Sequence, residues 1–96
     1  MVVLQIEHHV PNYEGWKKAF DSDPIDRKKS GVKEYRVYRP IGDSNYVIID
    51  LIFDTVENAQ STLRALQNLW TKVQGTVMTN PTTRMLEMLR DEKIEA

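Results

Sequence analysis

The chain has 96 residues, of which 41% are hydrophobic and 28% are charged, so we expect one globular domain over residues 1–96 and exclude a second core. It has no cysteine, which excludes disulfides, thiolate metal sites and cysteine nucleophiles. It has 13 basic and 14 acidic side chains, and this balance argues against nucleic-acid binding. It shows no basic leader and no apolar run long enough for a bilayer, so we expect a cytoplasmic protein that does not bind membrane.

Residues 2–10 show the two-residue alternation of a β-strand, which ends before Pro11. Its almost wholly apolar face consists of Val2, Leu4, Ile6, His8 and Val10. Its mixed face consists of Val3, Gln5, Glu7 and His9. Because adjacent strand residues point to opposite faces, the two histidines are poorly placed to share a metal ion, and we predict no metal site.

Two short helices are predicted next. Asn12 is a good N-cap for a helix over residues 12–21, whose aromatic residues Tyr13, Trp16 and Phe20 recur at helical spacing. Asp23, followed by Pro24, is a second helix start. We expect that helix to end at Gly31, a residue type suited to the position after a helix.

Residues 32–39 and 46–53 are predicted to form a β-hairpin around a turn rich in Gly, Asp, Ser and Asn. The second of these strands is apolar on both faces and therefore belongs in the middle of a sheet. The turn does not fix the pairing register: either Arg36 and Tyr38, or Tyr35 and Arg39, lie beside Asp50.

A helix is predicted over residues 55–72, with Asp54 as its cap and Glu57 completing a capping box. Its apolar stripe consists of Val56, Ala59, Leu63, Leu66, Trp70 and Val73. The stripe allows the helix to continue past Gly75 toward Met78.

The last segment has two possible structures. Asn80 and Pro81 resemble a helix start, whereas the threonines that follow favour a strand. We predict a strand over residues 83–91, because the strand at 46–53 needs partners on both sides.

The resulting order is βαββαβ. This order predicts an α+β fold of the ferredoxin-like type, a four-stranded antiparallel sheet with the helices on one face and the first and third strands in the centre. The helices can cover only one face of such a sheet. The other face carries Ile48 and Ile52, so we expect a second copy to cover it, in a homodimer with a shared barrel-like core.

Residues throughout positions 3–90 resemble the dimeric α+β barrel superfamily, especially its small antibiotic-biosynthesis-monooxygenase-like and cyclase-like proteins. The residues that carry the resemblance are His9, Pro11, Tyr13, Trp16, Phe20, Asp21, Gly31, Val32, Asp43, Asn45, Tyr46, Val47, Phe53 and Asp54. The superfamily includes oxygenases, haem-processing enzymes and isomerases, so the resemblance implies a fold more firmly than an activity. This chain has histidines on its first strand where the haem-degrading members have asparagine.

The predicted catalytic residues are His9 and Asp50. With Glu7, they are polar side chains on the two central strands, and buried polar groups need partners. We predict that Asp50 orients the His9 imidazole as a general base in a pocket between the sheet and the helices, with Trp70 as an apolar wall. The alternatives are a structural or surface histidine and a solvated or hydrogen-bonded carboxylate.

The predicted substrate-binding residues are Glu7, Trp70, Arg84 and Arg36. The resemblance to cofactor-independent oxygenases, which place an asparagine, a tryptophan and a histidine or arginine around the substrate, points to Asn68, Trp70 and Arg84. Asn68 and Trp70 are two residues apart on a helix, so they cannot both face one pocket. For Arg36 and for Arg39 on the same predicted strand, an exposed salt bridge is the alternative.

The function that these patterns favour is a homodimer that binds a small organic molecule. It would act as a cofactor-independent monooxygenase-like or cyclase-like enzyme on an aromatic or polyketide-type substrate. No glycine-rich phosphate loop is present, so no nucleotide cofactor is expected, and we predict no cofactor of any kind. The alternative is a ligand-binding or sensing dimer without catalysis.

Overall fold

The computed structural model describes residues 1–73 and 79–95 of the chain. Its strands and helices follow one another as β1 (Val2–His9), α1 (Tyr13–Asp21), α2 (Arg27–Ser30), β2 (Val32–Tyr38), β3 (Tyr46–Phe53), α3 (Val56–Val73) and β4 (Thr79–Glu87). This order, with α2 as an additional helical turn, is the predicted βαββαβ arrangement of a ferredoxin-like α+β fold.

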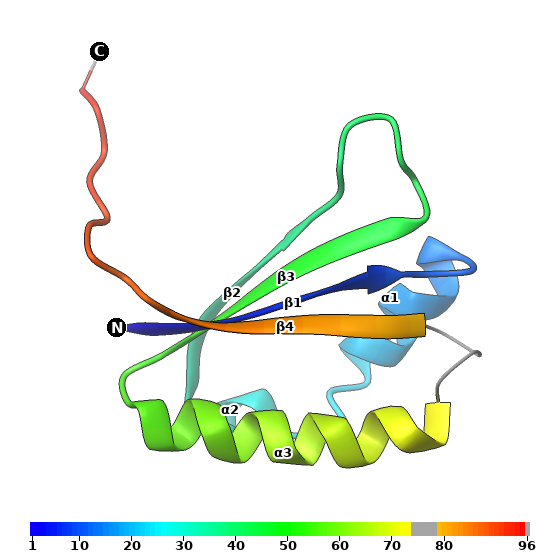
Figure 1. Ribbon diagram of the computed structural model, residues 1–96, viewed down its shortest axis with the longest axis horizontal. Coiled ribbons are helices and arrows are strands. Elements are labelled where there is room, and N and C mark those ends of the chain that lie inside the picture. Colours follow the sequence, from blue (N-terminus) through cyan, green and yellow to red (C-terminus); the bar gives the residue numbers. More distant parts are fainter. Residues whose placement is uncertain (74–78, 96) are drawn as a thin grey trace.

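The four strands form one antiparallel sheet in the order β2-β3-β1-β4, with β1 and β3 in the centre as predicted (Figure 1). Gln5 of β1 lies opposite Asp50 of β3 and opposite Arg84 of β4. Arg36 of β2 lies on the other side of Asp50. This register places Arg36 and Tyr38, rather than Tyr35 and Arg39, on the same face as Asp50.

One face of the sheet packs against the helices and forms the core. From the two central strands it contributes Val2, Leu4, Ile6, Val47, Ile49, Leu51 and Phe53. Trp16 of α1, and Ala59 and Leu66 of α3, pack against these residues. The helices therefore lie on one face of the sheet, and the predicted apolar face of β1 is the one that they cover.

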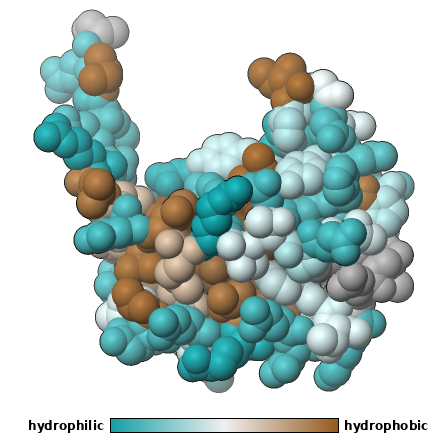
Figure 2. All heavy atoms as spheres, in the orientation of Figure 1, coloured by the Kyte–Doolittle hydropathy of each residue, from teal (hydrophilic) through white to brown (hydrophobic). Residues whose placement is uncertain are grey.

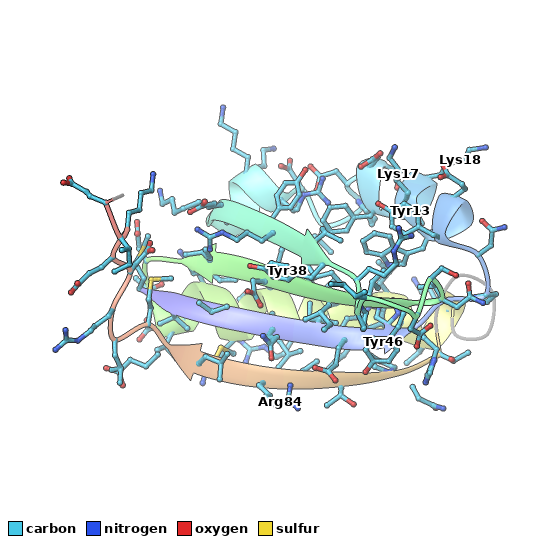
Figure 3. The ribbon with its side chains drawn as sticks, turned by 90° about the horizontal axis from the view of Figure 1, so that it is seen from above. Tyr13, Lys17, Lys18, Tyr38, Tyr46 and Arg84 are labelled. Atoms are coloured by element: carbon cyan, nitrogen blue, oxygen red, sulfur yellow. The ribbon has the colours of Figure 1, made fainter. Side chains whose placement is uncertain are left out.

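The opposite face of the sheet has no helix over it, and we call it the open face. It consists of Val3, Gln5, Glu7 and His9 of β1, Tyr46, Ile48, Asp50 and Ile52 of β3, Glu34, Arg36 and Tyr38 of β2, and Thr82, Arg84 and Leu86 of β4. Figure 3 looks onto this face, where Tyr38, Tyr46 and Arg84 are labelled. Polar and apolar side chains alternate across it.

Two segments project beyond the open face, away from α3: the loop between β2 and β3, and the residues that follow β4 (Figure 1). Both carry apolar side chains that are almost fully exposed, namely Ile41 in the loop and Leu89 and Ile94 in the C-terminal segment. Figure 2 shows this apolar surface at the tip of the loop and along the C-terminal segment. The open face thus lies between two exposed apolar arms.

The starts of two helices differ from the prediction. Asp23 adopts a φ of 55°, and its side chain accepts a hydrogen bond from the Arg27 N–H at 2.9 Å. The chain turns before α2 begins, and the cap is Asp26, which accepts from the Lys29 N–H at 3.2 Å. Gly31 ends this helix with a φ of 95°, as predicted.

The cap of α3 is Thr55 instead of Asp54. The Thr55 hydroxyl oxygen accepts a hydrogen bond from the Asn58 N–H at 3.2 Å. The helix begins at Val56, so Thr55 occupies the cap position, and the Asp54 carboxylate lies 3.6 Å from the Lys33 ammonium. The predicted continuation of this helix toward Met78 lies outside the described residues.

The last strand forms as predicted, but it covers Thr79–Glu87 instead of residues 83–91. Its pairing with β1 runs from Thr79 opposite His9 to Glu87 opposite Val2. Beyond Glu87, one more hydrogen bond joins the two segments, from the Met88 N–H to the Met1 carbonyl oxygen at 3.0 Å. Pro81 is tolerated because β4 is an edge strand.

Candidate functional site

A cavity of about 230 Å³ lies between the helix-covered face of the sheet and the helices. Its walls are mainly apolar, and their aromatic members are Trp16, Phe20 and Trp70. His8 of β1 and Arg27 of α2 are the two strongly polar side chains among its lining residues. A mostly apolar cavity with a few polar groups is the usual form of a small-molecule site.

The aromatic wall is an ordered array along α1. The rings of Trp16 and Phe20 stack with their centroids 5.0 Å apart, because the two residues are four positions apart on the helix. The Phe20 ring meets Tyr35 of β2 edge to face at 5.2 Å, and the Trp16 ring lies 6.2 Å from the His8 ring. These contacts fix flat surfaces against which a planar ligand can stack.

His8 is buried, with 3% of its surface exposed, and it borders the cavity. Its Nδ1 lies 3.0 Å from the His9 carbonyl oxygen. A carbonyl oxygen can only accept, so Nδ1 carries the proton and Nε2 of the neutral ring is an acceptor. Burial lowers the pKa of His8 below its ordinary value of 6.5, with the contact to the His9 carbonyl opposing this and the neighbouring His9 charge adding to it.

Arg27 brings a positive charge to the same cavity. Its guanidinium lies over the Phe20 ring at 4.1 Å and over the Tyr35 ring at 5.0 Å. Its Nη1 donates to the Phe20 carbonyl oxygen at 2.8 Å, and its Nε lies 3.5 Å from the Asp23 carboxylate. The side chain is 16% exposed, so these contacts hold a largely buried cation.

The open face carries a hydrogen-bonded network. Gln5 donates to Asp50 at 3.1 Å, and Arg84 donates to Gln5 at 3.0 Å and to Glu7 at 2.9 Å. The Tyr46 hydroxyl donates to Glu7 at 2.8 Å. The Arg84 and Tyr46 bonds lower the pKa of Glu7 below 4.5, and the bond to the Glu7 carboxylate raises the pKa of Tyr46 above 10.0.

The structure separates the residues that were predicted to share one site. Trp70 lines the helix-side cavity, whereas Glu7, Arg84, Arg36, His9 and Asp50 all lie on the open face. Asn68 is exposed on α3, as the helical geometry requires if Trp70 faces inward. The predicted pocket exists, but His9 and Asp50 do not border it.

His9 and Asp50 also fail to meet on the open face. His9 pairs with Tyr46, and its ring meets the Tyr46 ring edge to face at 4.8 Å. Asp50 lies four positions further along β3, a distance of about 13 Å at roughly 3.3 Å per residue. Asp50 instead accepts a hydrogen bond from Gln5. The prediction that His9 and Asp50 form a catalytic pair is therefore wrong.

Sequence reasoning missed His8 and Arg27 as site residues. The alternation along β1 does place His8 with the apolar residues that face the helices, and a polar group in that row was the available signal. Arg27 had no such signal, because it stands beside Lys28 and Lys29 in a segment rich in exposed charges. Its position at the cavity depends on how α2 packs against β2.

Neither a metal centre nor a membrane helix is found in residues 1–73 and 79–95. No group of three or more His, Cys, Asp or Glu side chains there is placed to hold a metal ion. No helix there is long and apolar enough to cross a membrane.

Comparison with known proteins identifies relatives through the fold. No protein-family model matches the sequence, and no curated protein matches it significantly. SnoaB, a cofactor-independent oxygenase from Streptomyces nogalater, superimposes with a TM-score of 0.75 at 10% identity over 94% of each chain. A candidate antibiotic biosynthesis monooxygenase from Nitrosomonas europaea gives 0.71 at 15% identity, over 94% of this chain and 100% of that one.

A third similar structure is that of the haem degrader MhuD from Mycobacterium tuberculosis, with two haems bound in its active site. It gives a TM-score of 0.68 at 16% identity, over 95% of this chain and 99% of that one. At these identities, the similarity establishes the fold and leaves the activity to be argued from the site. The chain has the α+β fold of the antibiotic-biosynthesis-monooxygenase-like proteins.

Proposed function

We propose that the protein is a homodimer that binds a planar aromatic molecule in the helix-side cavity and oxidises it with dioxygen, as a cofactor-independent monooxygenase. The observation that carries this proposal is the buried His8 imidazole, whose Nδ1 faces the His9 carbonyl oxygen and which borders an apolar cavity walled by Trp16 and Phe20. Such a site suits a flat ligand with one hydroxyl group that donates to Nε2. The fold shared with SnoaB supports an oxygenase of this kind.

The size of the cavity limits the ligand. Its volume of about 230 Å³ lies below the roughly 300–1,000 Å³ of typical ligand sites. A molecule of two or three fused rings fits this space better than a porphyrin does. We therefore assign the site to a polyketide-like phenol rather than to haem.

The proposed oxidation requires two things of the protein, a base and a pocket that excludes water. His8 Nε2 takes the proton of the bound phenol, and the phenolate is a stronger electron donor than the phenol. The phenolate reduces dioxygen and forms a carbon–oxygen bond with it. Loss of water then leaves a quinone, so one oxygen atom enters the product, the other enters water, and the substrate supplies all the electrons. The lowered pKa of His8 keeps the base unprotonated at neutral pH.

Anthrone, whose enol is a three-ring phenol, tests the activity. We expect the protein to convert anthrone and dioxygen into anthraquinone and water faster than the spontaneous reaction. His8→Gln is expected to lower the rate at least about 100-fold, as the loss of a general base does. The matched control is His9→Gln, whose side chain lies on the open face and is expected to leave the rate unchanged.

Oxygen uptake and anthraquinone absorbance follow the reaction. Binding of anthrone without any oxygen uptake would contradict the oxygenase and favour the ligand-binding alternative. Equal rates for the two histidine variants would contradict the role of His8.

The homodimer is supported by the open face. Val3 and Ile52 there are buried within one chain, but Ile48 and Leu86 are still partly exposed, and the two apolar arms project beyond them. A second copy placed against this face would cover both the apolar side chains and the arms. The two sheets would then enclose the hydrogen-bonded network between them.

Replacing Ile48 with aspartate is expected to convert the dimer into a monomer, because it places an unpaired charge in the centre of the open face. Sedimentation velocity at micromolar concentration measures the state. Val56→Asp is the control: Val56 is an exposed apolar residue away from the open face and begins α3, where aspartate suits the helix dipole. A wild-type monomer, or an Ile48→Asp variant that stays dimeric, would contradict the proposed interface.

A further inference from the structure

The helix-side cavity contains a charge that the proposed oxidation does not use. Arg27 lines the cavity, and its guanidinium lies over the Phe20 ring and over the Tyr35 ring. The neighbouring Lys28 and Lys29 are exposed and do not line the cavity. Of three consecutive basic residues, the fold thus directs one to the pocket and leaves two in solvent.

The contacts of Arg27 leave part of its donor capacity unused. Nη1 donates to the Phe20 carbonyl oxygen, and Nε faces the Asp23 carboxylate. Among the described residues, no partner is found for Nη2, which carries two N–H groups. The Asp23 side chain is 36% exposed and its contact with Nε is long, at 3.5 Å, so solvent weakens its compensation of the charge.

The apolar surroundings of Arg27 strengthen the attraction between its guanidinium and an anion. An anion that reaches Arg27 in an apolar cavity loses little of its attraction to solvent screening. A guanidinium matches the planar geometry of a carboxylate and donates charge-assisted hydrogen bonds to it. The two aromatic rings and the Phe20 carbonyl oxygen hold the guanidinium in place, so little side-chain freedom is lost on binding.

We propose that Arg27 is the anion-binding group of this cavity and that the natural ligand is an aromatic carboxylic acid, with its ring system against Trp16 and Phe20 and its carboxylate at Arg27. This proposal rests on the proposed function, since it places its ligand in the same cavity. It adds the requirement that the ligand carries a negative charge at Arg27, which the oxidation itself does not need. Arg27 is then the residue that determines specificity.

The experiment compares 2-naphthoic acid with 2-naphthamide, which have the same ring system and nearly the same shape but differ in charge at neutral pH. Dissociation constants are measured by isothermal titration calorimetry with the full chain. Wild type is expected to bind the acid at least about tenfold more tightly than the amide, the ratio that one charge-assisted hydrogen bond supplies. Arg27→Gln is expected to lose the preference for the acid and to bind the two compounds about equally.

Two further variants keep the result interpretable. Arg27→Lys retains the charge and is expected to retain a preference for the acid. Arg39→Gln removes a guanidinium that also lies over an aromatic ring, at 5.3 Å from Tyr13, but outside the cavity lining. We expect this variant to behave as wild type.

The possible failures are distinguishable. If wild type binds acid and amide equally, or if Arg27→Gln keeps the preference, the anion-binding role is overturned while the aromatic site stands. If neither compound binds to wild type, the aromatic site itself is overturned, and this proposal with it. Loss of amide binding in Arg27→Gln would show that Arg27 shapes the cavity instead of selecting a charge, and would also overturn the proposal.

Discussion

Replacing Trp16 with alanine is expected to lower the free energy of unfolding by about 3–5 kcal/mol, as removal of a large buried aromatic side chain does. Trp16 is 6% exposed and belongs to the core that α1 forms with the sheet. It also links the aromatic array, since its ring contacts Tyr13, Phe20 and His8. The change would remove a large share of the 5–15 kcal/mol that typically stabilises a protein.

Urea denaturation at a fixed protein concentration measures this loss. Trp16→Phe is the matched variant, because it keeps a ring against Phe20 and loses less buried area, so we expect a smaller loss than for alanine. A loss below about 1 kcal/mol for Trp16→Ala would be typical of a surface position. It would mean that α1 does not pack on the sheet as the structure describes.

Periodicity predicted the sheet of this protein well, because each central strand has a marked pattern. Strand β1 alternates from Leu4 to His9, and β3 is apolar on both faces, so the pattern along each strand predicted its central place. Helix starts were less predictable because several capping residues compete. Asp54 and Thr55 are both good caps, and the structure uses Thr55, whose hydroxyl oxygen accepts from the Asn58 N–H.

The site could be predicted only in part, because it depends on which strand residues face each other. Alternation assigned His8 and His9 to opposite faces, but polarity drew attention to the face with more polar residues, which proved to be the open face. The register that sets Asp50 beside Gln5 and Arg36 is not encoded in either strand alone. Arg27 reaches the cavity through the packing of α2, which no local pattern specifies.

The buried His8 is expected to make the protein less stable in mild acid. Burial lowers the pKa of His8 in the folded state, so the unfolded chain binds its proton more readily. The stability that comes from keeping the ring neutral is therefore complete above the unfolded pKa of about 6.5. It declines as the pH falls toward the folded pKa, by at most about 1.4 kcal/mol per pH unit for one proton.

The pH range in which His8 affects stability is separate from that of Glu7, the carboxylic acid whose pKa is also lowered. Glu7 has a lowered pKa, so its contribution is complete above about pH 4.5 and is lost only as the pH falls through its folded value. Of these two groups, His8 is therefore the one whose contribution changes between pH 7.5 and pH 5.

The measurement is the free energy of unfolding of three proteins at pH 7.5, 6.5, 5.5 and 5.0. Wild type is expected to lose stability progressively below pH 6.5. His9→Gln is the control, because His9 lies on the opposite face of the sheet and does not line the cavity, and it is expected to keep this slope. His8→Gln removes the titrating group and is expected to give a nearly flat curve. If His8→Gln keeps the wild-type slope, the His8 ring is not held neutral by the cavity. Since the proposed oxidation needs that neutral ring as its base, the same curve tests whether His8 is able to accept the substrate proton at neutral pH.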